Sequence, residues 1–391
     1  MQTNLVVGLG FGDEGKGRVV SSLVSSDPDA IVVRYCGGHQ AGHTVVKDRL
    51  DTTKPHVFSS FGSGTLHGAP TYWSRFCTFY PWAVRNEFNR LQELGVTPTL
   101  YVDALCPVTT NFDVAHNKIR EEKVRHGSVG VGIGSTFARH EAFYKLYFQD
   151  LFNVTVLRAK LDNIMLRYYS DTVTLEWEDL RDKFLQSAAF IRDCANIHLV
   201  QGKKIDFNKY DNVIFEGAQG ILLDQDFGFF PNVTRGNTTS KNAVTLLKEF
   251  NLPRPRIYRL TRTYQTRHGN GFMSNEDKEP LLIHTEQETN TTGPWQGPFR
   301  KGCLDLDLIR YAVQCDQQFT GDRLSTLVVT CVDQLGTCFP VTSNQRLVDF
   351  NLNEPEQWQK ELRGCRFDSM MVSESRFTEP LLQLYDDVGD L

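Results

Sequence analysis

Several features that would place a chain in a membrane or outside the cell are missing from this sequence of 391 residues. No apolar core of a signal peptide follows Met1, and no apolar run approaches the ~20 residues that a membrane helix needs. We therefore expect a cytoplasmic protein that has no membrane partner.

Closely paired cysteines are also missing. The nine cysteines are scattered, their number is odd, and none forms a C-x-x-C pair, which argues against a disulfide framework and a zinc knuckle. His39 and His43 are spaced as metal-binding histidines on a helix would be, but glycines surround them and the glutamate of H-E-x-x-H is absent. We expect reduced, mostly buried thiols, and we disfavour a two-histidine metal site.

An excess of positive charge is missing as well. The formal net charge is −5 and the charged fraction is 23%, so the surface as a whole is not built to hold nucleic acid. Hydrophobic residues make up 40% of the chain, which is enough for a large core. No repeat, low-complexity tract or Pro/Ser-rich linker marks a boundary. We predict one domain over residues 1–391 that has no nucleic-acid partner.

Short apolar runs alternate with helical periodicity along the chain. The run 4–9 ends in glycines, 14–24 has a helical pattern and 30–35 is a second apolar run, so the chain opens with a β-α-β unit. Further strands are predicted at 100–102, 213–215, 256–260 and 327–331, and further helices at 83–94, 180–191, 241–250 and 304–313. The pattern predicts an α/β fold around a mainly parallel sheet.

The loop 10–17 follows the first predicted strand and opens the first helix. Its backbone N–H groups and the helix dipole therefore point at one place, which makes it a P-loop-like anion site. Its spacing matches G-x-x-x-x-G-K, but Gly17 stands where a Ser or Thr normally holds magnesium. Asp13 is the carboxylate inside the loop, and a cation or a transferable proton must compensate its charge beside phosphates. The alternative is a structural turn in which Asp13 and Glu14 satisfy the helix terminus.

A second glycine loop, 37–44, leaves the carboxyl end of the next predicted strand. Ligands of open α/β sheets bind at this edge, so both loops are expected to face one crevice. His39 in that loop could donate a proton or a hydrogen bond to an oxygen that gains charge, and its alternative is a core histidine.

At this point five motifs in order resemble the adenylosuccinate synthetase family. They are Gly12-Asp-Glu-Gly-Lys-Gly17, Gly37-Gly-His-Gln-Ala-Gly-His-Thr44, Gly130-Val-Gly-Ile-Gly134, Phe215-Glu-Gly-Ala-Gln-Gly220 with Leu223-Asp224, and Pro231-Asn-Val-Thr234 with Asn237-Thr-Thr239. The resemblance implies one α/β domain and a homodimer that shares residues between its two sites. It also implies a ligase that joins L-aspartate to the six position of a purine nucleotide, through a 6-phosphoryl intermediate formed from a nucleoside triphosphate.

The resemblance implies a role for each matching position. Asp13 would be the general base and a Mg²⁺ ligand, Gly38 would offer its carbonyl to Mg²⁺, and His39 would polarise the six-position oxygen. The triphosphate would contact Gly12, Glu14, Gly15, Lys16, Gly17, Gly38, His39, Gly42, Thr44 and Asp333. The purine monophosphate would contact Asp13, Ser128, Gly130, Gln219, Thr234 and His268, together with Arg139 reaching in from the partner subunit.

Three regions depart from the family pattern. The arginine-rich loop for aspartate is represented by 290–301, where Arg300 is the only arginine, so Thr291, Thr292 and Arg300 are the expected aspartate contacts, with Lys301 second. Cys331 replaces a donor in the guanine-reading motif, which leaves ATP and dATP open beside GTP. His268 stands where the ordinary enzymes have a small apolar residue near the sugar.

These departures resemble a viral branch of the family that uses dGMP and makes the succinylated precursor of 2-aminoadenine deoxynucleotide for bacteriophage DNA. Its enzymes work in the host cytoplasm. Several of its members lack the loop aspartate, whereas Asp13 is present here. We favour dGMP, and ordinary use of IMP with GTP remains open.

Two other classes of protein use similar glycine loops. A non-catalytic nucleotide switch would keep the Ser or Thr after Lys16. A dinucleotide-binding oxidoreductase would need an acidic residue at the end of the second strand, where this chain has Arg34, Tyr35 and Cys36. We disfavour both.

Overall fold

The computed structural model describes residues 1–27, 29–47, 55–124, 127–172, 176–202, 204–284, 290, 295–321 and 325–385. A ten-stranded sheet crosses the molecule, and its neighbouring strands are parallel except for the last two at one edge, which are antiparallel. In spatial order its strands are β16 (Leu382–Tyr385), β15 (Phe367–Val372), β12 (Ser325–Thr330), β9 (Arg256–Arg262), β1 (Gln2–Gly8), β8 (Asn212–Glu216), β2 (Ala30–Arg34), β5 (Thr71–Trp73), β6 (Leu100–Asp103) and β7 (Ile197–Val200).

The predicted α/β fold with a mainly parallel sheet is confirmed. β1 lies in the middle, with Leu5 in register with Phe215 on one side and Ile257 on the other. Each apolar run that the sequence assigned to a strand overlaps β1, β2, β6, β8, β9 or β12, and three of the runs extend one residue beyond the end of the strand. These strands are buried on both faces, which is why they are continuous apolar runs without alternation.

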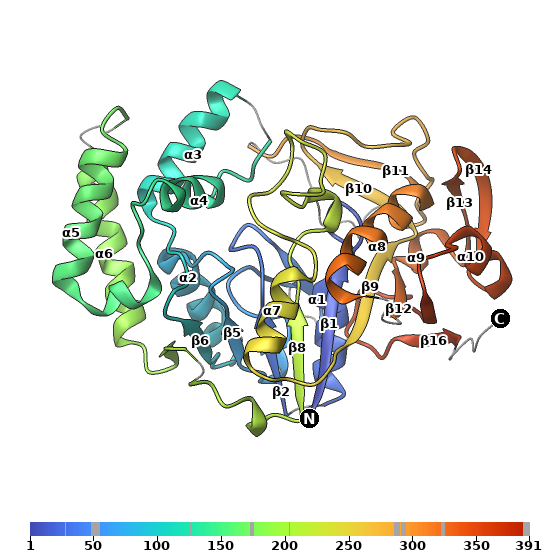
Figure 1. Cartoon of the computed structure of the whole chain (residues 1–391), viewed down its shortest axis with the longest axis horizontal. Coiled ribbons are helices and arrows are strands. Elements are labelled where there is room, and N and C mark those ends of the chain that lie inside the picture. Colours follow the sequence, from blue (N-terminus) through green and yellow to red (C-terminus); the bar gives the residue numbers. More distant parts are fainter. Residues whose placement is uncertain are drawn as a thin grey trace.

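Helices cover both faces of the sheet. On one face α1 (Lys16–Ser25) packs Val19, Val20 and Val24 against the β1 residue Val6 and the β2 residue Val32. The opposite face carries the largest core, to which α7 (Lys241–Glu249) and α8 (Leu306–Thr320) contribute. Figure 1 shows α7 in front of the central strands and α8 beside β9 and β12.

A second core lies at the end of the sheet formed by β5, β6 and β7. Figure 1 shows that the helices gathered there include α2 (Pro81–Glu93), α3 (Asn111–Val124), α4 (Ile133–Glu141), α5 (Val154–Asn163) and α6 (Trp177–Asp193). At the other end lie α9 (Val332–Leu335), α10 (Pro355–Glu361) and a smaller sheet of β10 (Tyr264–His268), β11 (Phe299–Asp305), β13 (Cys338–Ser343) and β14 (Arg346–Asn351). A separate ribbon pairs β3 (His43–Val45) with β4 (His56–Phe58).

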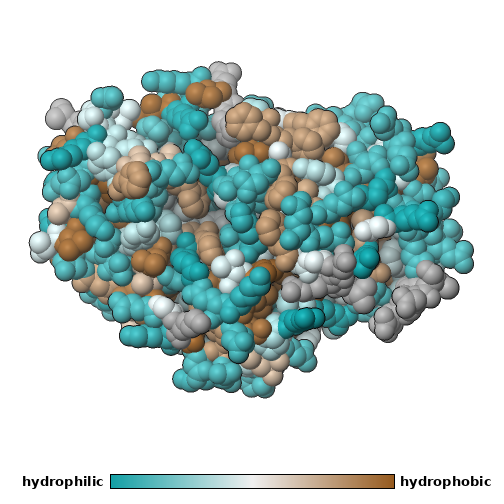
Figure 2. Space-filling view, in the orientation of Figure 1, coloured by the Kyte–Doolittle hydropathy of each residue, from teal (hydrophilic) through white to brown (hydrophobic). Residues whose placement is uncertain are grey.

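The face of the molecule shown in Figure 2 is mostly polar, as expected when the apolar residues are buried in the core. Figure 2 shows a largely hydrophilic face on which hydrophobic residues occur in small, separate groups. Among the residues that the structure describes, no helix combines the length and apolar content of a membrane span.

The parallel strands place their following loops at one edge of the sheet. Loops after β1, β2, β8, β9 and β12 all leave from carboxyl ends, where open α/β sheets bind their ligands. The two glycine loops of the sequence follow β1 and β2, so the topology brings them to this same edge.

Candidate active site

A cavity of about 1190 Å³ opens at this edge of the sheet. Side chains and backbone from segments far apart in the sequence line it. They fall within 11–18, 40–46, 117–121, 127–135, 219–235, 262–270, 330–334 and 373–376, together with Glu141, Asn290 and Gln296. Its size suits several small substrates bound together, because single ligand pockets usually measure ~300–1,000 Å³.

The loop 10–17, which we call the phosphate loop after its expected ligand, has a backbone that few residues tolerate. Gly12, Asp13 and Gly15 have φ values of 100°, 63° and 78°, and α1 begins at the next residue, Lys16. Glycine adopts positive φ without steric cost, and Asp is one of the few other residues that reach it. The loop therefore turns its amides and the amino terminus of α1 toward the cavity, which Gly12, Asp13, Gly15 and Lys16 line.

Glu14 behaves differently from its neighbours. Its carboxylate turns inward and accepts hydrogen bonds from the backbone N–H of Gly10 at 3.0 Å and of Gly12 at 2.8 Å. Nζ of Lys16 donates to the same carboxylate at 2.5 Å. Glu14 does not line the cavity, so the expected contact of this residue with the triphosphate is wrong for this structure. Its carboxylate instead holds the backbone of the loop and the Lys16 ammonium group in place.

Gly17 explains why the usual hydroxyl after the lysine is missing. A Cβ at this position would lie 2.8 Å from Cβ of His43 and 3.0 Å from Oγ of Ser63. Contacts below about 3 Å leave no room for a side chain, so α1 approaches β3 closely only because position 17 is glycine. Gly17 still lines the cavity through its backbone.

Asp13 lies between His268 and Arg262 at the cavity wall. Its Oδ2 lies 3.2 Å from Nε2 of His268, and its backbone oxygen accepts a 2.6 Å hydrogen bond from Nε of Arg262. Burial disfavours the ionised carboxylate, but the His268 hydrogen bond and the charges of Arg262, His268 and Lys16 outweigh it and lower the pKa of Asp13. Asp13 is therefore an ionised acceptor at neutral pH.

The second glycine loop reaches the cavity with only part of its length. Gly42 and Thr44 line the cavity, but Gly38 and His39 do not. A Cβ on Gly38 would fall 2.2 Å from Oγ1 of Thr78, which shows how tightly this turn is packed. The expectation that Gly38 and His39 face the crevice is therefore wrong for this structure.

His39 instead packs against an aromatic ring. Its ring centroid is 4.8 Å from that of Tyr80, and both ring nitrogens are buried without a hydrogen-bond partner among the described residues. Burial lowers the pKa of His39 to about 3, so the ring is neutral.

The loops expected to hold the purine monophosphate do meet in the cavity. Ser128, Gly130, Gln219, Thr234 and His268 all line it. Trp295 packs against one of these loops, because a Cβ on Gly130 would touch the Trp295 ring at 3.1 Å. The tight packing of these loops agrees with a preformed site.

Arg139 is buried within its own subunit and does not have the role that the resemblance implied. Its side chain is 0% exposed and its Nε lies 2.9 Å from Oδ1 of Asp113. The remaining guanidinium N–H groups donate to Oδ2 of Asp113 and to the carbonyl oxygens of Val108 and Tyr144. The same Asp113 accepts from the Tyr169 hydroxyl at 2.7 Å. A guanidinium satisfied in this way cannot reach a partner subunit's phosphate.

The expected aspartate contacts belong to the segment 290–301. Thr291 and Thr292 lie outside the described residues. Arg300 is described, but it pairs with Glu276 at 2.5 Å, donates to the Gly271 carbonyl at 2.9 Å and does not line the cavity. Lys301 pairs with Glu279 at 3.0 Å. The expected contact of Arg300 with aspartate is therefore wrong for this structure, in which Arg300 binds neighbouring residues of the chain.

Arginines that sequence reasoning missed surround the cavity instead. The lining includes Arg18, Arg120, Arg235, Arg262, Arg267 and Arg376. Arg267 is 2% exposed and donates to the carbonyl oxygens of Asn232, Asn270 and Phe272. These arginines are groups that can contact phosphates and carboxylates, although the net charge of the chain is −5. No spacing in the sequence signals this cluster, because it forms only when distant loops converge.

The cavity lining also includes Asp333, which was expected to contact the triphosphate, and its neighbours in the segment 330–334. Burial raises the pKa of the Asp333 carboxyl group. Cys331 also lines the cavity, with a left-handed φ of 58° just before α9. Thr330 ties this segment to the phosphate loop, since its Oγ1 donates to the Glu14 carbonyl at 3.1 Å.

Comparisons with known proteins agree with the motifs. The family model for adenylosuccinate synthetase matches residues 5–354. Adenylosuccinate synthetase 1 of Pseudoalteromonas translucida is 34% identical over 330 residues, which cover 79% of this chain and 74% of that protein. The adenylosuccinate synthetase of Francisella philomiragia is 28% identical over 349 residues, covering 86% of this chain and 78% of that protein.

Two solved structures share the fold. A fully ligated adenylosuccinate synthetase from Plasmodium falciparum has a TM-score of 0.75 at 17% identity and covers 98% of this chain and 99% of that one. A cyanophage S-2L succinoaminodeoxyadenylate synthetase bound to dGMP and dATP as an energy donor has a TM-score of 0.64 at 15% identity, covering 98% and 95%. At these identities the likeness carries the architecture alone.

Proposed function

This chain belongs to the adenylosuccinate synthetase family, so it is a carbon–nitrogen ligase that joins aspartate to a purine nucleotide, and we propose that the nucleotide is dGMP. The product would be the succinylated precursor of 2-aminoadenine deoxynucleotide. We further propose a Mg²⁺-dependent homodimer that takes ATP, dATP or GTP as phosphate donor.

The pair formed by Asp13 and His268 carries the proposal. A guanine base presents its N1–H and its 2-amino group side by side, whereas hypoxanthine has only a C–H at position two. The tautomer of His268 that donates from Nε2 to Asp13, 3.2 Å away, leaves Nδ1 as an acceptor. With the purine N1–H on Asp13, that acceptor would serve the neighbouring 2-amino group. A small apolar residue at 268 would offer guanine no such partner.

The proposed reaction begins at Asp13. Its ionised carboxylate would take the N1 proton, and O6 of the purine would then attack the terminal phosphorus of the triphosphate while the bond to the bridging oxygen breaks. Backbone amides of the loop that contains Gly12 and Gly15, together with Lys16, would stabilise the transferred charge. The amine of aspartate would then add at C6, and phosphate would leave with the former O6. His39 is given no step, because its ring nitrogens are buried.

The fit to Mg²⁺ rests on the donor chemistry at Asp13. This cavity-lining carboxylate has a lowered pKa, and Mg²⁺ is usually held by one or two carboxylates together with phosphate oxygens. The Gly38 carbonyl does not line the cavity and accepts a 3.3 Å hydrogen bond from the Ala41 N–H, so Asp13 is the ligand we assign. When bound, Mg²⁺ would neutralise charge on the triphosphate.

A product assay tests the choice of substrate. The purified chain with Mg²⁺ and aspartate is offered dGMP, GMP or IMP, each with ATP, dATP or GTP, and the succinylated product is measured by mass spectrometry. We expect the highest kcat/KM with dGMP. For His268→Val we expect kcat/KM to shift toward IMP by about tenfold or more, since leaving one buried donor without its acceptor costs ~1–3 kcal/mol.

A control keeps this test specific. His198 on β7 stacks on Tyr101 and does not line the cavity, so His198→Val should leave the ratio of dGMP to IMP unchanged. Preference of the unmodified chain for IMP with GTP would return it to the ordinary biosynthetic reaction and overturn the dGMP proposal.

A further inference from the structure

One corner of the cavity is built by three segments that are far apart in the sequence. They are the first turn of α1, the start of α9 and the segment after β15, and they contribute Arg18, Asp333 and Ser373 to the cavity lining. Hydrogen bonds tie them together: the Val332 N–H donates to the Ser373 carbonyl at 3.3 Å, and Nε of Arg18 donates to the Phe377 carbonyl at 3.0 Å. We call this the α1–α9 corner.

Arg18 has an unused donor in this corner. It is 7% exposed, and its Nη1 is buried with no hydrogen-bond partner among the residues that the structure describes. Burial lowers the pKa of Arg18 to about 10, and the charges of Glu379 and Asp333 oppose this shift, so the guanidinium is a cation at neutral pH. Leaving such a buried donor without an acceptor costs free energy, so its place beside a cavity points to a ligand that accepts from it.

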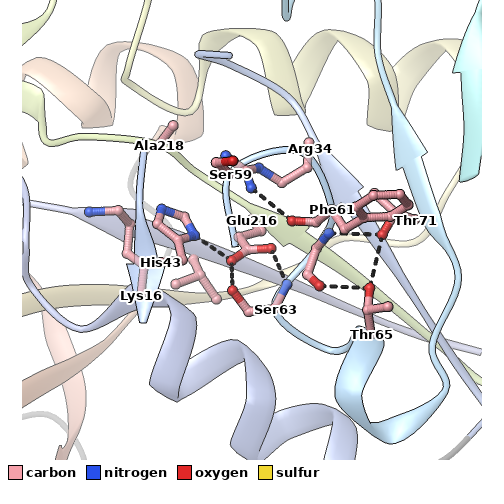
Figure 3. Close-up of polar contacts among 12 residues, drawn as sticks. Lys16, Arg34, His43, Ser59, Phe61, Ser63, Thr65, Thr71, Glu216 and Ala218 are labelled. Atoms are coloured by element: carbon pink, nitrogen blue, oxygen red, sulfur yellow. Dashed lines mark hydrogen bonds and ion pairs between the residues drawn. The ribbon is translucent and has the colours of Figure 1, made fainter. Parts of the chain in front are cut away.

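The phosphates of a triphosphate are expected at a different part of the cavity. Lys16 and His43 line the cavity at the phosphate loop, and Figure 3 shows the His43 ring between the side chains of Lys16 and Glu216. Successive residues of an α-helix point roughly 100° apart, so Gly17, which approaches His43, and Arg18 face different sides of α1. Arg18 faces the segment after β15 instead. The α1–α9 corner is therefore available to the base of the triphosphate.

Arg18 and Asp333 offer this base a donor and an acceptor. A guanidinium has only N–H donors, and an ionised carboxylate has only acceptors. Guanine presents the acceptor O6 next to the donors N1–H and 2-amino, whereas adenine presents a 6-amino donor next to the acceptor N1. Guanine therefore matches both side chains, and adenine would place donor against donor and acceptor against acceptor. Cys331 also lines the cavity, but its S–H is only a weak donor.

We propose that Arg18 contacts the base of the triphosphate and selects guanine: its guanidinium donates to O6, while Asp333 accepts from N1–H and the 2-amino group. The inference rests on the proposed function, because it requires the loop 10–17 to hold the phosphates. It narrows the choice among ATP, dATP and GTP to GTP. Arg18 determines which nucleotide binds and takes no part in phosphoryl transfer.

Calorimetric titration with the β,γ-imido analogues of GTP and ATP tests the proposal. Mg²⁺ is present, aspartate is omitted, and dGMP or IMP, whichever binds, occupies the monophosphate site. We expect the unmodified chain to bind the GTP analogue about tenfold or more tightly than the ATP analogue. Arg18→Met keeps the length of the side chain without its donors, so it should reduce this ratio about tenfold. Arg18→Lys retains a donor and should keep part of the preference.

A control and a second measurement separate base selection from folding. Arg75 is partly buried, pairs with Glu249 and does not line the cavity, so Arg75→Met should leave the ratio unchanged. The affinity of Arg18→Met for the purine monophosphate should match that of the unmodified chain.

Two results overturn this inference alone. The first is binding of the ATP analogue to the unmodified chain as tightly as the GTP analogue. The second is an Arg18→Met protein in which both analogues weaken equally, because this would indicate a contact with the phosphates. Failure of both analogues to bind the unmodified chain overturns the triphosphate site itself.

Discussion

Asp13→Asn is expected to lower kcat by about 10² to 10⁴ while dGMP and the triphosphate still bind, because the amide cannot accept the N1 proton. Asparagine is the informative replacement at this position. The backbone φ of Asp13 is 63°, and Asn tolerates this conformation whereas Ala is strained there. Rapid-quench measurement of product formation, combined with equilibrium binding of each nucleotide, separates the chemical step from binding.

Asp226 provides the control for this substitution. It lines the same cavity and pairs with Lys241 and Asn237 at the surface, so Asp226→Asn removes a nearby charge without touching the proposed base. Its kcat should change little. Turnover of Asp13→Asn at the unmodified rate would remove Asp13 from the mechanism.

The pH profile follows from the same group. Asp13 must be ionised to act, and its pKa lies below its ordinary value of 3.8, so the acid limb of kcat/KM should fall at low pH. His268→Val removes the hydrogen bond that lowers this pKa. The acid limb should therefore move toward neutral pH in that variant.

Arg139→Leu is expected to destabilise the fold by about 3–5 kcal/mol, since it leaves the buried Asp113 carboxylate without its cation. Urea unfolding at equilibrium measures this loss. The double variant Asp113→Asn with Arg139→Leu should recover part of it, because the uncompensated charge is gone. A stable Arg139→Leu protein that no longer binds the purine monophosphate would mean that Arg139 contacts the ligand after all.

The central strands and the helices α7 and α8 could be predicted from the sequence. Strands buried on both faces, such as β1 and β8, are continuous apolar runs, and α7 and α8 have a clear apolar stripe. The helix α3 was missed for a physical reason. The residues that it buries are mostly polar, including Asn111, Asp113, Asn117 and Glu121, so apolar periodicity could not reveal it.

The wrong predictions for Arg139 and His39 arise from contacts between segments that are far apart in the sequence. Arg139 seemed free to reach a ligand because its partner Asp113 lies on that undetected helix. His39 was expected in the crevice because its loop faces that edge, but the packing of Gly38 on Thr78 and of His39 on Tyr80 depends on contacts between distant segments. The glycine-rich turn before the first helix could be predicted, since its φ values and the start of α1 follow from local sequence.

Transfer of the purine oxygen to phosphate is the most direct test of the whole account. The chain is supplied with dGMP carrying ¹⁸O at position six, together with aspartate, Mg²⁺ and the preferred triphosphate, and the released phosphate is examined by mass spectrometry. Activation of O6 by phosphoryl transfer predicts one ¹⁸O atom in each phosphate formed with product. Succinylated product accompanied by phosphate without the label would contradict it.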